Sequence, residues 1–321
     1  EAIRGSLLKA FDLSAAPKVV HLAAETKLIH NLWGEIGNPP TFAEVPVPGT
    51  SVFCPAQVRP EAVIFHRNKD GSLLRLLRAS MGIKDVQAQA VKNQVTPVFA
   101  FCRKDENLMA AAMAWLTKLH AKLPRSCVLH FDPFVTRASV IKNLAMQVFE
   151  RVIVSNYPSP RPPYVGWPGA PNWAFMHACW FMDDQNSGPW FWIESDAVAI
   201  KPDWLDQIDA EYSKAGKPFM GTVFPNNTHM NGVGVYPARV ETYAPSVFKM
   251  VTEAWDFKCG PEIVPHAHNA NHLIQHNDNG HNWGPKVFDH TNIRHINKTT
   301  VVYHPIKNDS LTKLLQAGHR P

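Results

Sequence analysis

The chain has 321 residues, 45% of them hydrophobic and 18% charged, with a net charge of +5 at pH 7. These values are typical of a globular protein and argue against a disordered chain, and the length suffices for one domain with an extension or for two domains. No apolar run approaches the ~20 residues of a membrane span, and no secretory signal begins at Glu1. We therefore expect no membrane span and a cytoplasmic location, a host cytoplasm if the protein is viral.

The cysteines argue against two classes of small metal or redox site. They are widely spaced and form no CxxC pair, so zinc ribbons and thioredoxin-like motifs are not expected. The pattern favours a reducing compartment. The five are Cys54, Cys102, Cys127, Cys179 and Cys259.

Residues 1–92 differ from the rest of the chain. The segments 18–25 and 62–67 are typical of short strands, and residues 71–82 of a short amphipathic helix. The sequence between the two strands is too rich in proline for helices. We find no chemical motif here and predict an N-terminal extension or small accessory domain of unknown role, followed by a main domain over residues 93–321.

From residue 95 onward, predicted strands and helices alternate. Strands are expected over 96–101, 126–132, 151–157 and 189–196, and helices over 105–123, 139–149 and 172–182. In the first helix, Asp105 is the expected N-cap, and one face carries Leu108, Ala112, Trp115 and Leu119. The alternation predicts an α/β fold with a mainly parallel sheet, whose ligands bind at the carboxyl ends of the strands.

The most informative motif lies at the end of the fourth predicted strand. An apolar run from Trp190 to Ile193 ends in Glu194-Ser195-Asp196. Two carboxylates at the end of a buried strand are costly unless a positive charge lies between them. A divalent cation that carries a diphosphate would supply that charge.

This motif, together with the strand and helix order, resembles the GT-A class of glycosyltransferases, which carry a DxD or ExD motif here. The resemblance implies a GT-A-like mixed sheet and transfer of a sugar, hexosyltransferase-like, from a nucleotide sugar to an acceptor hydroxyl. Glu194 and Asp196 would hold Mn²⁺ or Mg²⁺ on the diphosphate, with Ser195 beside the nucleotide. The donor implied is a UDP-sugar. The sequence IKPDWLDQI fits a helix that follows the motif in the family.

Two later segments extend the resemblance. His304 follows the strand-like residues 301–303 and would complete the metal ligands, with Lys307 on the diphosphate. An imidazole can join carboxylates around manganese, and a lysine neutralises phosphate. Residues 217–240 are expected to form a strand, a loop and a glycine-kinked strand near the donor sugar or the acceptor. The candidates there are Asn231 and Gly232, with the loop residues Asn227, His229 and Met230.

Further candidates concern the nucleotide and the proton of the acceptor. Arg103, Asp105 and Asp132 follow predicted strands and are assigned to the nucleotide. An inverting transferase needs a general base. Asp256 is our choice as a catalytic residue beside Asp196, and the stereochemical outcome is left open. The other acids in this part of the chain are Glu253, Glu262 and Asp278.

Rival hypotheses remain. His268, His272 and His276 would share one face of a helix and hold zinc in a metal-dependent hydrolase. A non-catalytic module could bind a nucleotide or glycan on the same fold. A Rossmann oxidoreductase is disfavoured, because no GxGxxG follows the first strand. The acceptor could be a hydroxymethylated base of phage-type DNA, a glycan or a protein. A DNA acceptor would use the basic residues Arg59, Arg67, Lys69, Arg75 and Arg78.

Overall fold

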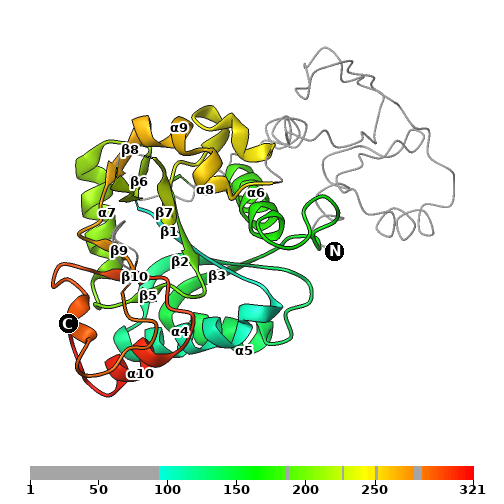
Figure 1. Cartoon of the computed structure of the whole chain (residues 1–321). Coiled ribbons are helices and arrows are strands. Elements are labelled where there is room, and N and C mark those ends of the chain that lie inside the picture. The colour runs from blue at the N-terminus through cyan, green and yellow to red at the C-terminus, as the bar shows by residue number, and fades with distance from the viewer. Residues whose placement is uncertain (1–93, 186–187, 226–227, 250–251, 278–283) are drawn as a thin grey trace, which may run out of the picture. The chain divides into compact units, whose positions relative to one another are not determined.

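The computed structural model describes residues 94–321, apart from 186–187, 226–227, 250–251 and 278–283 (Figure 1). The predicted accessory region, with its two strands and one helix, lies outside the described residues. So do the basic residues assigned to DNA, and the candidates Asn227 and Asp278.

A seven-stranded sheet with the order β3-β2-β1-β4-β7-β6-β8 forms the centre of the described part. Its strands β1 to β4 are mutually parallel, whereas β7 runs antiparallel to both β4 and β6. The prediction of a mixed, mainly parallel sheet is confirmed. The strands are β1 (Thr96–Phe101), β2 (Leu123–Phe131), β3 (Phe149–Asn156), β4 (Trp190–Glu194), β6 (Phe219–Val223), β7 (Met230–Tyr236) and β8 (Ala267–Asn269).

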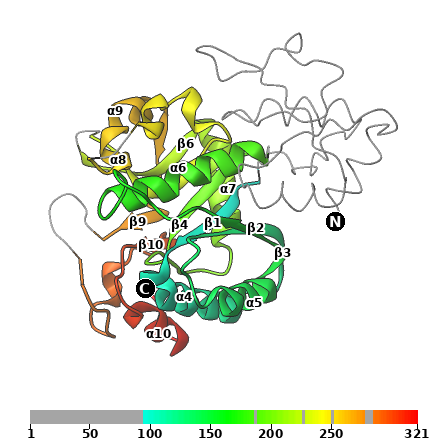
Figure 2. The same ribbon diagram turned by 90° about the vertical axis from the view of Figure 1, so that its right-hand side faces the viewer.

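Helices cover both faces of this sheet. Figure 2 shows α4 and α5 on one side and α6 on the other. The α-helices are α4 (Glu106–Leu119), α5 (Ala138–Val148), α6 (Gly169–Asp184), α7 (Trp204–Ala215), α8 (Trp255–Lys258), α9 (Gly260–Ile263) and α10 (Ser310–Gln316). Short 3₁₀ turns are η2 (Arg103–Asp105), η4 (Val240–Thr242), η5 (Pro245–Phe248), η6 (Val264–His266) and η7 (Ile293–His295).

Strand β4 shows why its sequence is apolar on both faces. Phe191 and Ile193 lie in the core that contains α4, α5 and α7 residues. Trp190 and Trp192 lie in the opposite core, with residues of α6, α8 and α9. Successive side chains of a strand point to opposite faces, so a strand buried on both sides needs an unbroken apolar run. The apolar run ends where this burial ends, and the acidic motif follows at the carboxyl end of β4.

A second sheet of three short strands has the order β5-β10-β9. It contains β5 (Val198–Ala199), β9 (Ile274–His276) and β10 (Val302–His304). The strand β10 is antiparallel to β5 and parallel to β9. Because β5 follows the acidic motif closely, this pairing brings the end of β10 next to the end of β4. Sequence patterns predicted β10 but neither of its partners.

Several predicted boundaries differ from the structure. The helix predicted over 105–123 ends at Leu119, because the chain enters β2 at Leu123. The helix predicted over 172–182 begins earlier, at Gly169, with Pro171 in its first turn, where proline is tolerated. The predicted helix after the acidic motif is confirmed as α7. Among the described residues, no helix has the length and apolar character needed to cross a membrane.

Candidate functional site

The carboxyl ends of four parallel strands meet at one edge of the large sheet. There β1, β2, β3 and β4 end at Phe101, Phe131, Asn156 and Glu194. The polar residues that follow these strands therefore lie along a common edge, as predicted. The fourth of these ends carries the acidic motif.

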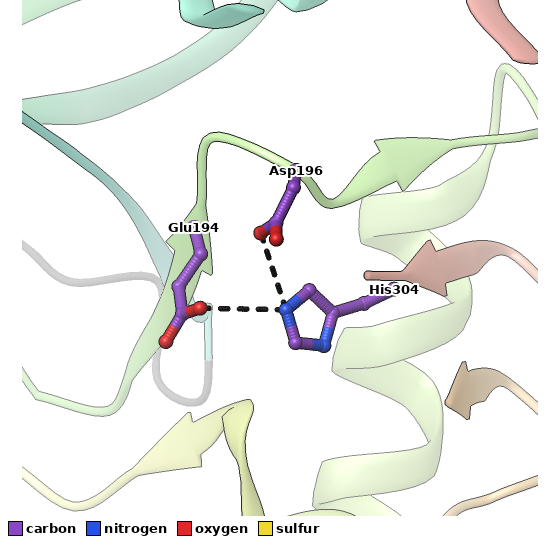
Figure 3. Close-up of side chains that lie close together, drawn as sticks. All are labelled: Glu194, Asp196 and His304. Carbon is purple, nitrogen blue, oxygen red and sulfur yellow. Dashed lines mark ion pairs between the residues drawn. The ribbon is translucent and has the colours of Figure 1, made fainter. Parts of the chain in front are cut away.

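Glu194, Asp196 and His304 converge at this edge (Figure 3). The Nε2 atom of His304 lies 3.3 Å from Glu194 Oε2 and 3.2 Å from Asp196 Oδ1. One possible ligand atom from each residue lies within 4.8 Å of the others. In the part of the chain that the structure describes, no other group of three or more His, Cys, Asp or Glu side chains meets this condition.

The three side chains fit a divalent cation. The Asp196 side chain is 3% exposed and that of His304 7% exposed, whereas that of Glu194 is 37% exposed. Asp196 Oδ1 and His304 Nε2 are buried and face each other at angles that do not make a hydrogen bond. Buried polar atoms without such partners call for an ion or water. Carboxylates suit Mg²⁺ and Mn²⁺, and the imidazole adds a nitrogen ligand.

The charges of these groups depend strongly on one another. Burial opposes ionisation of Asp196, but His304 and Lys307 outweigh it and hold the pKa of Asp196 well below its usual range. Burial likewise opposes the charge on His304, but Asp196 and Glu194 outweigh it and raise the pKa of His304 to about 9. Lys307 Nζ bonds Asp196 Oδ2. Partial desolvation of the ammonium group opposes its charge, but the Asp196 carboxylate outweighs this effect and raises the pKa of Lys307. The site therefore holds compensating charges, which a cation could replace.

Backbone pairing fixes His304 and Asp196 relative to each other. The amide of Ile306 donates to the Asp196 carbonyl over 2.8 Å, and the amide of Asn277 donates to the His304 carbonyl. Asn277 is buried and its Oδ1 accepts from the Tyr303 hydroxyl over 2.6 Å. Sequence reasoning missed this anchoring role, since nothing in the sequence marks an asparagine that bonds a strand far along the chain.

Gly232 in β7 lies beside the acidic motif, and Asn231 precedes it in the same strand. A Cβ atom on Gly232 would lie 3.1 Å from Glu194 Oε1, so the β7 backbone approaches this carboxylate closely. The side chain of Asn231 accepts from the Val233 amide over 3.1 Å and is buried. Of the loop candidates, His229 is stacked on Phe257 with ring centroids 3.9 Å apart, and Met230 is in the core.

Asp256, the predicted base, lies in α8 within electrostatic range of Glu194 and His304. Burial, and then the negative charge of Glu194, raise the pKa of Asp256 to about 6. A carboxylate with a pKa close to neutrality suits proton transfer better than an ordinary one. Asp256 is therefore close enough to Glu194 for the two carboxylates to interact electrostatically.

The other acids considered as bases have structural partners. Glu262 accepts from the amide and hydroxyl of Ser246. Glu253 forms an exposed ion pair of 3.1 Å with Lys258. These contacts explain both side chains without a catalytic role.

The nucleotide candidates lie at the ends of β1 and β2. Asp132 Oδ2 accepts from the Arg103 amide over 3.2 Å, and Oδ1 accepts from the Phe134 amide over 2.7 Å. Asp132 therefore joins two strand-end loops, while the Arg103 side chain is exposed. Asp105 occupies the N-cap position of α4 without a capping bond, contacts Cys102 Sγ at 3.2 Å and acts electrostatically on Lys307.

The prediction that three histidines share a helix face is wrong. His268 lies in β8 of the large sheet, where it pairs with Glu211 at 2.7 Å, and His276 lies in β9 of the small sheet. The residues between them form a turn that includes the exposed His272. Asn269 and Asn271 favour such a turn over a helix. The basis for a zinc hydrolase is therefore lost.

No protein-family model and no curated protein matches the sequence. The chain resembles several solved structures. For the apo form of mouse xyloside xylosyltransferase 1, identity is 12%, coverage 67% of this chain and 98% of the other, and the TM-score 0.41. For the galactosyltransferase LgtC with donor and acceptor sugar analogues, identity is 10%, coverage 67% of this chain and 88% of the other, and the TM-score 0.42. For the bifunctional glycosyltransferase WbbM, identity is 9%, coverage 66% of this chain and 46% of the other, and the TM-score 0.40.

These solved structures are all described as glycosyltransferases. Identities of 12% or less and TM-scores below 0.5 leave the case for a function to the residues of the site.

Proposed function

We propose that the protein is a metal-dependent glycosyltransferase that moves a sugar from a nucleotide sugar to an acceptor hydroxyl. The observation that carries this proposal is the convergence of Glu194, Asp196 and His304 at a strand end, with Lys307 beside them. Glu194, Asp196 and His304 would hold the cation, which would also bind the diphosphate of the donor. A hydrolase based on the histidine segment has no such geometry to support it.

When bound, the cation would offset the negative charge that grows on the leaving diphosphate. Glu194, Asp196 and His304 would hold it. Before a substrate arrives, Glu194 is held at the end of β4, Asp196 in the turn that follows, and His304 at the end of β10. Such preset groups stabilise a transition state without reorganisation. The Lys307 side chain is 79% exposed, so its ammonium group can turn from Asp196 to a phosphate oxygen.

In the reaction, the bond between the sugar and the diphosphate breaks, and its electron pair stays on the diphosphate. A new bond forms between the sugar carbon and the acceptor oxygen. In an inverting reaction, the acceptor proton goes to the Asp256 carboxylate, which is mostly ionised at pH 7 since its pKa is about 6. A retaining reaction needs no such base, so Asp256→Asn would be much less harmful there.

The donor proposed is a UDP-sugar, and the cation Mn²⁺ or Mg²⁺, as the family resemblance implies. Arg103, Asp105, Asp132 and Ser195 are proposed near the nucleotide. Asn231 and Gly232 are proposed near the sugar. The nucleotide candidates are supported by their place after the carboxyl ends of β1, β2 and β4, and the sugar candidates by the close approach of Gly232 to Glu194.

Thermal stability with a panel of nucleotide sugars, with and without Mn²⁺, tests the proposal. One donor should raise the melting temperature only when Mn²⁺ is present, and Asp196→Asn should abolish this rise. The matched control is Asp203→Asn, an exposed acid at the start of α7, which should behave as wild type. No shift with any donor, or an equal shift in Asp196→Asn, would contradict the metal-diphosphate site.

Release of the nucleoside diphosphate separates an enzyme from a binding module. Turnover is expected with the donor that stabilises the protein, once an acceptor is present. Donor binding without release, across glycan, protein and hydroxymethylated DNA acceptors, would favour the non-catalytic module. A gel shift that weakens with salt would support the DNA acceptor proposed from the basic N-terminal residues.

A further inference from the structure

Trp192 contacts the candidate metal site from the core side of β4. Its indole Nε1 donates a hydrogen bond to Glu194 Oε1 over 3.3 Å. The two residues are two positions apart on a strand, so their side chains project from the same face. The bond uses one carboxylate oxygen and leaves the other, Oε2, at 3.3 Å from His304 Nε2.

Strand β7 and helix α8 enclose the same carboxylate oxygen. A Cβ atom on Gly232 would lie 3.1 Å from Glu194 Oε1 and 3.3 Å from Cζ2 of Trp255. The Trp192 indole and the Gly232 backbone thus limit where Oε1 can lie, and the Trp255 ring stands next to them. A rotation of the carboxylate that took Oε2 away from His304 would move Oε1 out of this place.

The Trp192 ring is itself held in position. It is 3% exposed and packs edge-on against Phe175, with ring centroids 5.2 Å apart and planes at 83°. The His130 ring lies 6.0 Å from it. A ring fixed this tightly holds its N–H group in a constant direction.

We infer that Trp192 is a positioning residue that orients Glu194 toward the cation through its indole N–H. The inference rests on the proposed metal site and adds a residue that the family resemblance did not assign. Hydrogen-bond partners of metal ligands typically change metal affinity by about 10–100-fold when removed. The ligand concerned is the most exposed of the three, so it has the greatest need of such a partner.

The chain offers a matched pair of substitutions. Trp192→Phe removes the N–H group and keeps an aromatic ring in the core. Trp190→Phe makes the same change two residues earlier, on the same strand face, where Nε1 bonds the Pro237 carbonyl at 2.9 Å instead. Mn²⁺ affinity is measured from the free-ion electron paramagnetic resonance signal, and folding from the melting temperature.

Trp192→Phe is expected to weaken Mn²⁺ binding by about tenfold or more, while Trp190→Phe retains wild-type affinity. A purely structural role would lower both melting temperatures and leave both affinities unchanged, which would overturn the inference. If Trp192→Phe does not fold, Gly232→Ala is the second variant, because its added Cβ would lie 3.1 Å from Glu194 Oε1 and displace this oxygen. An unchanged Mn²⁺ affinity of Gly232→Ala would overturn the inference. Wild-type protein that binds no Mn²⁺ would overturn both this inference and the proposed metal site.

Discussion

At the residue scale, the candidate site depends on side chains that have few alternatives to binding a cation. Asp196 and His304 are almost fully buried, and Asp196 Oδ1 and both ring nitrogens of His304 make no hydrogen bond within the described residues, although the two charged groups lie 3.2 Å apart. Lys307 differs, since it is exposed and bonds Asp196 only from outside. Substitution of a proposed metal ligand should therefore weaken cation binding, whereas substitution of Lys307 should weaken donor binding and leave cation binding intact.

Lys307→Met tests this separation. We expect the KM for the donor to rise by about 10–100-fold, because a charge-assisted hydrogen bond to phosphate contributes about 1.5–3 kcal/mol. Mn²⁺ binding without donor should persist. The control is Lys313→Met, another exposed lysine, which pairs with Asp309 at 2.9 Å in α10. Steady-state kinetics at varied donor concentration measures the effect, and equal KM values in the two variants would contradict it.

The three proposed ligands stand out in the sequence, whereas Trp192, proposed to orient Glu194, does not. Glu194 and Asp196 break an apolar run, and an acid at the end of a buried strand needs an explanation. His304 ends a second apolar run. Trp192 shows no such contrast, because a tryptophan among apolar residues fits plain packing equally well. Its hydrogen bond becomes visible only when the distance to Glu194 is known.

At the element scale, the alternation of strands and helices predicted the existence of β1 to β4 and their parallel direction, but not their order in the sheet. Their sequences are long and apolar enough to be recognised. Strands β5 and β9 have two and three residues, too few for a periodic pattern. The spacing of His268, His272 and His276 fitted a helix, but spacing alone does not decide against a turn that contains asparagine.

His130 in β2 makes hydrogen bonds to both β3 and α6. Its Nε2 donates to the Ala174 carbonyl, and its Nδ1 accepts from the Ser155 hydroxyl, each over 2.9 Å. Burial disfavours the cationic ring and lowers the pKa of His130 from 6.5 to about 3. The imidazole is therefore neutral in the folded protein and protonates more readily after unfolding.

This difference makes stability depend on pH with a defined sign. The contribution is complete above pH 6.5 and is lost as the pH falls towards 3. Between pH 7 and pH 5, His130 alone should lower the free energy of unfolding by about 2 kcal/mol. Urea unfolding at both pH values measures it, and His130→Gln should remove that part of the pH dependence. A variant with the wild-type dependence would show that the ring does not titrate in this way.

At the scale of the whole described part, the proposed metal site joins two sheets. Glu194 ends a strand of the large sheet, and His304 ends a strand of the small sheet. A cation held by both would tie the short strands β5, β9 and β10 to the larger core. Ligands that bind only the folded state stabilise it, most directly where they make contact.

Hydrogen exchange should reveal this coupling. With Mn²⁺ and donor present, amides of β5, β9 and β10 are expected to exchange more slowly, while those of α5 on the far side remain unchanged. Mass spectrometry of exchanged peptides measures the difference, with EDTA-treated protein as the reference. A uniform change across α5 and β10, or none in β10, would argue against a cation shared between the sheets.

The pairing of β5 with β10 also sets an order of events during synthesis. Asp196 leaves the ribosome long before His304 does, so the two acids of the motif exist for that interval without their imidazole and ammonium partners. Chains usually begin to fold from the N-terminal side. A chain stopped by a premature codon between β7 and β10 would therefore carry both acids of the motif and lack the imidazole and the ammonium group that compensate their charge.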